Sequence, residues 1–417
     1  MVIIESYNVI NIICKALNRV DKRLINHGER VAYIILKMLQ CENKLTKPEL
    51  QKICLLAVMH DIGAYKTDEI DRLVEFETSN IWQHSVYGYL FLKKLSPLAD
   101  LADAILYHHL PYEKFSEVEC RHKKLAMIFS LVDRIDIYME NNNFVLEEKA
   151  KTAFKSTHFS PDALELFYKA NDHYGILENI KSGSYKEELK EYLKTCEFPD
   201  GEIDSYLKML ALTIDFRSQA TALHTIMTVN ISVEIGRMMK LDEYWSDAVY
   251  YGSLLHDIGK ISTPLSILEN TGKLTYDEMQ IMKQHVSVSE EIIKDFINED
   301  ICNIAIRHHE KLDGSGYAYG LTAEQLTMCQ RAVAVADILS ALVGVRSYKK
   351  VFSKERTLEI INDMASNNKI CKEIVSLVLE NFDEIIENAQ KRSKTILEVY
   401  SSISDEYEPL FLKCSAI

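Results

Sequence analysis

Apolar residues recur at helical spacing along most of the chain, and the alternating pattern of a half-buried strand is scarce. The apolar runs that end at Met59 and Leu255 have this spacing, and each leads directly into a histidine. Several helix starts are marked by capping boxes or by proline in a first turn, as in Thr275-Tyr-Asp-Glu278, Thr322-Ala-Glu-Gln325 and Thr46-Lys-Pro-Glu49. The pattern predicts an almost entirely α-helical protein with at most a short hairpin.

Length and composition support the all-α prediction. The chain has 417 residues, enough for two to three domains, and it contains only 14 glycines and 7 prolines. All-β folds need frequent turn residues, so this scarcity favours long helices over a sandwich or barrel. The clearest turn cluster in mid-chain is Phe198-Pro-Asp-Gly-Glu202. Because no long linker is apparent, we expect two tandem helical domains packed together, at residues 1–200 and 201–417.

The net charge restricts the partners of the chain. The 48 Lys and Arg against 62 Asp and Glu give a formal charge of −14. We therefore expect neither polymeric nucleic acid nor a membrane as partner, whereas a small anionic substrate suits a site that gathers local positive charge. No uncharged apolar run reaches the length of a membrane span, and the amino terminus lacks a basic signal-peptide region. Nine cysteines without a Cys-x-x-Cys pair are typical of reduced thiols in a cytoplasmic protein.

The histidines form an internal repeat. Five of the 13 histidines pair in order with five others at offsets between 196 and 201 residues, and two aspartates pair with two others at offsets of 196 and 204 residues. The pairs are His27 with His224, His60 with His256, Asp61 with Asp257, His84 with His285, His108 with His308, His109 with His309 and Asp133 with Asp337. A lone buried histidine is usually an ordinary core residue, but packing alone would not keep polar residues in register while apolar ones drift. The repeat therefore predicts metal sites.

The second set of residues can hold two metal ions. It comprises His224, His256, Asp257, His285, His308, His309 and Asp337. Imidazole and carboxylate ligands suit iron, manganese or zinc, and seven such ligands are too many for one ion. The carboxylate of the adjacent histidine-aspartate pair can bridge both ions. Two metals bridged by a carboxylate and a hydroxide are suited to the hydrolysis of phosphate esters.

These residues lie in motifs that resemble the HD-GYP family of the HD phosphohydrolase superfamily. The resemblance covers about residues 215 to 350. Its motifs are His256-Asp-Ile-Gly-Lys260, the isolated His285, His308-His-Glu-Lys-Leu-Asp-Gly-Ser-Gly-Tyr-Ala318, and Ala336-Asp-Ile-Leu-Ser-Ala-Leu342 through Arg346-Ser-Tyr-Lys-Lys350. The family implies an all-helical HD domain that hydrolyses bacterial cyclic dinucleotides to linear dinucleotides, through a metal-bridging hydroxide at a two- or three-metal iron or manganese centre. The implied substrate is cyclic di-GMP. The tandem arrangement also resembles the bacterial 3′,3′-cyclic GMP-AMP phosphodiesterases, so both substrates stay open.

The resemblance also implies roles for single residues. His224, His256, Asp257 and Asp337 would hold one ion, and Asp257, His285, His308 and His309 would hold the other. Asp257 and Lys260 are the implied catalytic residues, because Lys260 follows the histidine-aspartate pair by one turn and can pair with a phosphate oxygen. The implied substrate contacts are Lys260, Asp313, Gly314, Gly316, Tyr317 and Arg346.

The sequence departs from the family pattern at two places. Ala318 stands where the name motif has proline, which loosens the loop without removing a metal ligand. Three-metal members of the family carry a glutamate four residues before the first histidine, where this chain has Ala220 and, in the first set, Arg23. We therefore favour two divalent ions over three.

The first half, over about residues 20 to 140, resembles the HD superfamily more weakly. Its ligand set is complete: His27, His60, Asp61, His84, His108, His109 and Asp133. Ala64 stands in the place of Lys260, with Lys66 two residues on, and Leu110-Pro-Tyr-Glu-Lys114 replaces the glycine-rich loop. We expect a divergent HD domain that binds metal but hydrolyses cyclic dinucleotides poorly or not at all. The alternative is a former site kept for packing.

Two other functions stay open. The chain could be a nucleotide phosphohydrolase of the wider superfamily that acts on an alarmone or a nucleoside phosphate, although the glycine-rich loop after His309 argues against this. It could instead be a non-catalytic scaffold that senses cyclic dinucleotides. The complete second ligand set and Lys260 argue against a scaffold.

Overall fold

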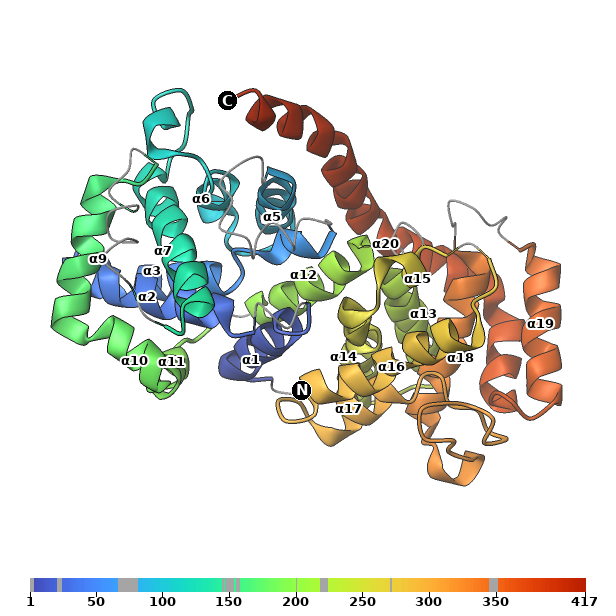
Figure 1. Ribbon diagram of the computed structural model, residues 1–417. Helices are drawn as coiled ribbons and strands as arrows, with labels where there is room; N and C mark the ends of the chain where they lie inside the picture. The colour runs from blue at the N-terminus through green and yellow to red at the C-terminus, as the bar shows by residue number, and fades with distance from the viewer. Residues whose placement is uncertain are drawn as a thin grey trace. The chain divides into compact units, whose positions relative to one another are not determined.

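Helices form all the regular secondary structure that the computed structural model describes (Figure 1). It describes residues 4–20, 25–66, 82–144, 146, 154, 158–199, 201–217, 224–270, 272–344 and 352–417, with only the backbone of residues 65 and 66. Within these ranges the sole β-type pairing is a bridge between Asp313 and Thr322. The predicted all-α fold is confirmed.

The chain divides into an amino-terminal unit, Glu5–Met209 with Ser402–Ile417, and a carboxy-terminal unit, Leu210–Ser401 with Ile4. The domain boundary at residue 200, and the packing of the two domains, stay predictions.

The amino-terminal unit is a bundle in which α2 packs against α3, α7 and α9. Its elements are α1 (Ser6–Leu17), α2 (His27–Glu42), α3 (Lys47–Val58), the 3₁₀ helix η2 (Ile62–Lys66), α5 (Trp82–Leu95), η3 (Ala99–Leu101), α6 (Ala102–Leu106), η4 (Tyr112–Lys114), α7 (Lys123–Asn141), α9 (Pro161–Tyr174), α10 (Ile176–Ser182) and α11 (Tyr185–Leu193).

In the carboxy-terminal unit, α13 packs against α14 and α18. The elements here are α13 (His224–Met238), α14 (Glu243–Leu255), η5 (Ile258–Ser262), α15 (Leu265–Leu268), α16 (Tyr276–Ile293), α17 (Glu299–Ile306), η6 (Ala323–Gln325), α18 (Met328–Val343) and α19 (Lys354–Ser366). Two helices, α12 (Glu202–Phe216) and α20 (Lys372–Ser415), each contribute residues to both units.

The histidine repeat is a repeat of helices. Helices α2, α3, α5, α6 and α7 hold the first set of residues, on the helix or just after its end, in the same order as α13, α14, α16, α17 and α18 hold the second. The first histidine of each set opens its helix, and the histidine-aspartate pair lies between an α-helix and a 3₁₀ helix. Each site is therefore assembled from residues on, or just after the ends of, five helices.

Local sequence explains where several helices begin. Capping boxes form at Thr46 and Thr275, and they open α3 and α16 as predicted. The capping box at Thr322 also forms, but it opens only the three-residue η6. Glu202 begins α12 directly after the predicted turn.

The end of the chain returns to the amino-terminal unit. Lys94 lies 2.7 Å from Glu406, and Tyr87 of α5 stacks on Tyr407 with ring centroids 4.0 Å apart. Cys414 is fully buried. All nine cysteines are free, and eight of them are buried, which agrees with the prediction of reduced core thiols.

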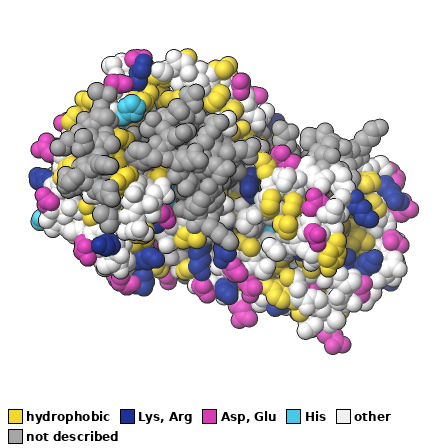
Figure 2. Space-filling model, in the orientation of Figure 1, with side chains coloured by type: hydrophobic (Ala, Val, Ile, Leu, Met, Phe, Trp, Pro, Cys, Tyr) yellow, Lys and Arg dark blue, Asp and Glu magenta, His cyan; other side chains and the backbone are white. Residues whose placement is uncertain are grey.

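Charged side chains of both signs are interspersed on the face of each unit that Figure 2 shows. Among the described residues, no helix combines the length and the apolar character needed to cross a membrane.

Candidate metal centre

The motif His256-Asp-Ile-Gly-Lys260 holds its two metal-binding candidates by a tight approach between η5 and α16. A Cβ atom on Gly259 would lie 2.0 Å from the carbonyl oxygen of His285, so only glycine fits there. Ser289 reinforces the contact, because its hydroxyl accepts from the Gly259 amide at 2.9 Å and donates to the His256 carbonyl at 3.0 Å. Gly63 in the amino-terminal unit meets the carbonyl oxygen of His84 at the same 2.0 Å. The motif thus fixes the aspartate relative to the next histidine of the set.

One group of ligand atoms gathers at the ends of α13 and α14. His224, His256 and Asp257 each offer an atom within 4.8 Å of the others. Oδ2 of Asp257 lies 3.1 Å from Nε2 of His256 and 3.6 Å from Nε2 of His224. Asp337 of α18 completes the group, with its Oδ1 2.8 Å from Nε2 of His224.

A second group lies on the other side of the same carboxylate. His285, His308 and His309 also have ligand atoms within 4.8 Å of one another. Oδ1 of Asp257 is 3.4 Å from Nε2 of His285 and 3.9 Å from Nε2 of His308. The two oxygens of Asp257 therefore face two different histidine groups, which is the arrangement of a bridging carboxylate. All seven candidates from the sequence come together here.

Hydrogen bonds to the remote ring nitrogens orient the histidines. Nδ1 of His256, His285 and His308 each lies 2.6–2.7 Å from the carbonyl oxygen three residues earlier. Nδ1 must donate in these contacts, so Nε2 of each neutral ring presents its lone pair to the centre of the site. Nδ1 of His224 contacts the Ser340 hydroxyl at 3.0 Å. Such second-shell bonds fix the tautomer that a metal ligand needs.

The electrostatics of the group are those of a buried cation site. Burial opposes the charge on Asp257, but His256 and Lys260 outweigh this effect and hold the pKa of the carboxyl well below its usual value. Burial likewise opposes protonation of His256, yet Asp257 and Asp337 raise its pKa to about 9. Burial lowers the pKa of His285 to about 4 and that of His309 to about 3. The second group is therefore neutral and ready to ligate at pH 7.

Unpaired buried oxygens show that these residues fit metal ions. Oδ1 of Asp257 is buried and accepts no hydrogen bond within the described parts of the chain, and Oδ1 of Asp61 and Oδ2 of Asp133 share this condition in the amino-terminal unit. A buried carboxylate oxygen without a donor is costly. A divalent cation between the carboxylate and the imidazoles would supply the missing partner.

Lys260 lies beside the bridging carboxylate, with its Nζ 2.5 Å from Oδ2 of Asp257. Burial opposes the charge of this ammonium group, but Asp257 raises its pKa. Arg217, which the sequence did not single out, donates from Nη1 to the carbonyl oxygens of Ile261 at 2.5 Å and Thr263 at 2.8 Å. It thereby fixes the segment that follows Lys260.

The glycine-rich loop covers the second histidine group. The ring of Tyr317 packs on His309 at 4.7 Å between centroids. A Cβ atom on Gly316 would lie within 2.4–2.7 Å of the backbone at Glu310 and Lys311, and Gly314 has a φ of 76°. The loop is held by buried Glu310, which accepts from the amides of Tyr319 at 2.7 Å and Leu321 at 2.9 Å. Glu310 was not predicted as a functional residue, although it directly follows the paired histidines.

Two of the predicted substrate contacts differ from the rest. The exposed side chain of Asp313 accepts hydrogen bonds from the amide and hydroxyl of Ser315, so it shapes the loop. Arg346 lies outside the described residues, as do Ala220 and Arg23.

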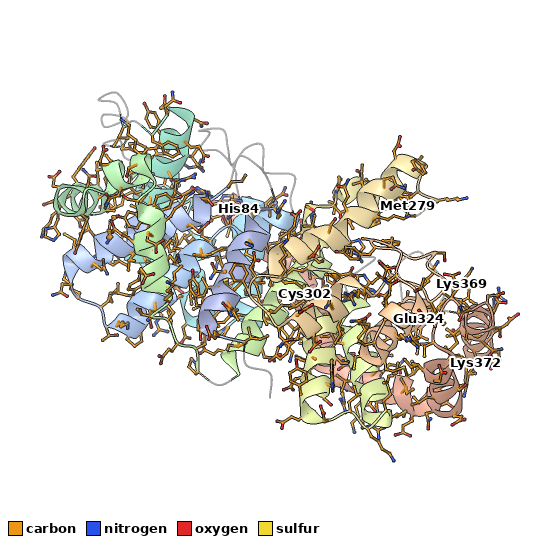
Figure 3. The ribbon with its side chains drawn as sticks, turned by 90° about the horizontal axis from the view of Figure 1, so that it is seen from below. His84, Met279, Cys302, Glu324, Lys369 and Lys372 are labelled. Atoms are coloured by element: carbon orange, nitrogen blue, oxygen red, sulfur yellow. The ribbon has the colours of Figure 1, made fainter. Side chains whose placement is uncertain are left out.

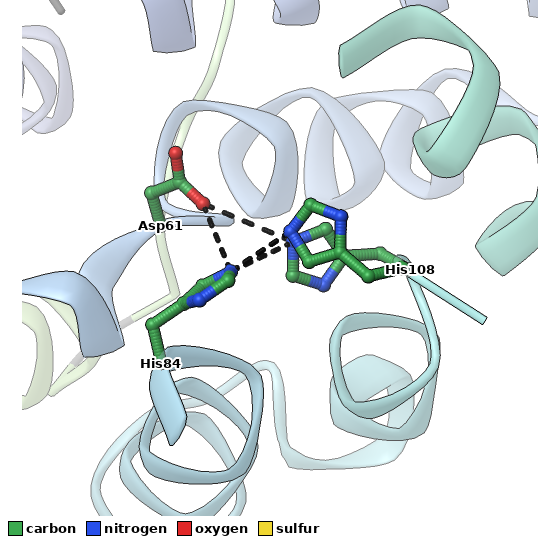
Figure 4. Close-up of side chains that lie close together, drawn as sticks. Asp61, His84 and His108 are labelled. Carbon is green, nitrogen blue, oxygen red and sulfur yellow. Dashed lines mark hydrogen bonds and ion pairs between the residues drawn. The ribbon is translucent and has the colours of Figure 1, made fainter. Parts of the chain in front are cut away.

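The amino-terminal unit repeats the two groups. Asp61, His84, His108 and His109 form one, and His27, His60 and Asp133 form the other. Figure 3 locates His84 among the helices of this unit, and Figure 4 shows Asp61, His84 and His108 pointing toward one another. Oδ1 of Asp61 is 3.7 Å from Nε2 of His84 and 3.8 Å from Nε2 of His108. Ala64, which replaces Lys260, is buried, and the side chain of Lys66 lies outside the described residues.

Charged residues that sequence analysis missed surround the amino-terminal group. Arg134 directly follows Asp133, where the carboxy-terminal unit has Ile338, and its Nη2 lies 3.1 Å from Nδ1 of His109. Buried Asp136 accepts from Arg30 at 2.7 Å and contacts Nδ1 of His27 at 2.7 Å. Both Arg134 and Asp136 interrupt an otherwise apolar helix, which was the available signal.

Comparison with known protein families matches an HD domain at residues 24–138 and a second HD domain at residues 206–374. The chain carries two HD domains in tandem. Among characterised relatives, 3′3′-cGAMP-specific phosphodiesterase 1 of Vibrio cholerae is 29% identical over 91% of this chain and 90% of its own length. A cyclic di-GMP phosphodiesterase of Thermotoga maritima is 32% identical over 54% of this chain and 60% of its own length.

A solved structure has the same fold as the tandem HD chain. The crystal structure of a cyclic GMP-AMP-specific phosphodiesterase of V. cholerae, V-cGAP3, aligns with a TM-score of 0.58 and 16% identity. The alignment covers 91% of this chain and 98% of that one. At this identity the likeness concerns the fold alone.

Proposed function

We propose that this tandem HD protein is a metal-dependent phosphodiesterase that opens bacterial cyclic dinucleotides to linear dinucleotides at its carboxy-terminal centre. The observation that carries the proposal is the position of Asp257, whose two oxygens face two separate histidine groups. The names of the relatives support the substrate class, since they are phosphodiesterases of 3′3′-cGAMP and of cyclic di-GMP. The relative that aligns along most of its length is specific for 3′3′-cGAMP, which favours that substrate.

Each group in the centre has a task in the hydrolysis, in which water adds across one P–O bond and leaves a phosphate monoester and a free hydroxyl. Two divalent ions, for which iron or manganese is our proposal, would lower the pKa of water and neutralise charge on the phosphate when bound. Asp257 holds the two histidine groups in register, and its buried carboxylate stays ionised. Lys260 offers an ammonium group to a phosphate oxygen, and Tyr317 shields His309 from solvent.

The proposed substrate and the thiols point to the same compartment. Cyclic dinucleotides of this kind are intracellular signals, and nine free cysteines suit a reducing environment. We therefore propose that the protein acts in the cytoplasm.

Product analysis tests the proposal. The full chain is loaded with iron or manganese and incubated separately with 3′,3′-cyclic GMP-AMP, cyclic di-GMP, an alarmone and a nucleoside triphosphate. We expect linear dinucleotide from at least one cyclic substrate and none with Asp257→Ala. Turnover of only the alarmone or the triphosphate would contradict the proposal, and so would the absence of any turnover in metal-loaded protein.

A further inference from the structure

Among the described residues, each HD unit has a buried cation beside an aspartate of its ligand set, but at different places. In the carboxy-terminal unit the cation is Lys260 beside Asp257. In the amino-terminal unit Ala64 takes that place, and Arg134 lies instead beside Asp133, with Nε 3.6 Å from Oδ2. The buried cation of this unit is therefore a planar guanidinium group that contacts a different aspartate of the ligand set.

The guanidinium of Arg134 is only partly satisfied. Its side chain is 4% exposed. Nη2 meets Nδ1 of His109 at 3.1 Å, whereas Nη1 is buried and makes no hydrogen bond within the described residues. A buried donor on a charged group is expensive to leave unpaired. The free donor therefore indicates a missing acceptor.

The contact with His109 also changes the metal cluster. A guanidinium can only donate, so Nδ1 of His109 accepts and Nε2 carries the proton. Nε2 lies 2.9 Å from Nε2 of His84, which can accept that proton. In the metal-free protein His84 and His109 thus satisfy each other, and the positive charge of Arg134 lies beside the group that corresponds to the second histidine group of the carboxy-terminal unit.

A small pocket lies next to Arg134. It is lined by His109, Pro111, Ser130, Arg134, His158 and Phe159, its cavity volume is about 20 Å³, and it is partly open to solvent. The guanidinium of Arg134, the imidazole of His158 and the hydroxyl of Ser130 can donate to an oxyanion, and no acidic side chain is among these lining residues. Arginine is the side chain best matched to the geometry of phosphate.

We propose that this pocket of the amino-terminal unit binds a phosphate group of a nucleotide through Arg134, with His158 and Ser130 as further donors. The site goes beyond the proposed hydrolysis and does not require it, because it lies in the other unit and needs no metal ion. It gives the divergent HD domain a binding role in place of the missing lysine and glycine-rich loop.

Calorimetric titration of the full chain tests this site. The protein is metal-free and carries Lys260→Ala, so that neither ions nor the carboxy-terminal lysine bind the probe. The probes are inorganic phosphate, guanosine monophosphate and cyclic di-GMP. We expect Arg134→Met to weaken the binding of the probe at least tenfold, and Arg134→Lys to weaken it less. Lys169→Met is the control: it removes an exposed cation from the same unit and should leave the affinity unchanged. The probe that binds with the highest affinity shows whether the pocket takes a free phosphate ion, a phosphate monoester or a phosphate diester.

His158→Ala provides a second test if the variant at the buried Arg134 does not fold, because His158 is only half-buried. We expect it to weaken phosphate binding several-fold while circular dichroism stays that of the parent. Equal binding to the parent and to both pocket variants would overturn the proposal. So would the failure of all three probes to bind the parent protein at millimolar concentration.

Discussion

At the scale of single residues, Lys260 separates phosphate binding from metal binding. An ammonium group cannot ligate a metal, so Lys260→Ala should keep the metal content of the protein. It removes one charge-assisted contact to phosphate, typically worth about 1.5–3 kcal/mol. We expect kcat/KM to fall roughly ten- to hundredfold. Metal analysis and steady-state kinetics check this, and loss of metal or unchanged turnover would show that the lysine does not contact the phosphate.

His256 gives the metal affinity a predictable dependence on pH. In the metal-free centre Asp257 and Asp337 outweigh burial and raise its pKa to about 9, so the ring is protonated at neutral pH. A ligand must lose its proton before it binds a metal, and protons therefore compete with the ion below pH 9. We expect the affinity for manganese to rise about tenfold per pH unit between roughly pH 7 and 9, as one proton is displaced. Titrations with manganese at several pH values that gave one constant affinity would contradict this.

At the scale of elements, the approach of η5 to α16 is the contact that positions the bridging aspartate. Gly259→Ala would place a methyl group 2.0 Å from the His285 carbonyl oxygen, which is backbone and cannot move aside without shifting the helix. Overpacking of this kind costs about 1–3 kcal/mol or more. We expect a lower melting temperature together with reduced metal content.

Gly272→Ala is the matched control for that substitution. A Cβ atom there meets only the side chain of half-buried Asn270, at 3.2 Å. We expect unfolding and metal content close to those of the parent. If the two variants behaved alike, the tight approach would not be what holds the motif in place.

The sequence predicted those elements that depend on spacing along the chain. The helix starts at Thr46 and Thr275 follow from the capping residues there. The repeated histidines follow from their matching spacing in the two halves, and the structure brings them together. Arg217 and Glu310 could not be predicted, because each acts by reaching backbone groups of another segment. Their roles depend on which segments the fold brings next to them, and no pattern in the sequence reports that.

At the scale of the whole molecule, both units have the same set of candidate metal ligands but differ in the residues around them. Both units hold two histidine groups around an aspartate, which spacing predicted. The carboxy-terminal unit has Lys260 and the loop with Tyr317, whereas the amino-terminal unit has Ala64 and Arg134. The return of residues 402–417 to the amino-terminal unit was not predicted, since its contacts, such as Tyr87 with Tyr407, join segments over 300 residues apart.

The most direct test of this division compares Asp257→Ala with Asp61→Ala in one assay of metal content and of cyclic dinucleotide hydrolysis. The two aspartates occupy matching positions, and both have a buried oxygen that lacks a hydrogen-bond donor within the described residues. We expect Asp257→Ala to abolish turnover and lower the metal content, and Asp61→Ala to lower the metal content while most turnover remains. Equal loss of turnover in both variants, or near-normal turnover with Asp257→Ala, would contradict a single catalytic centre bridged by Asp257.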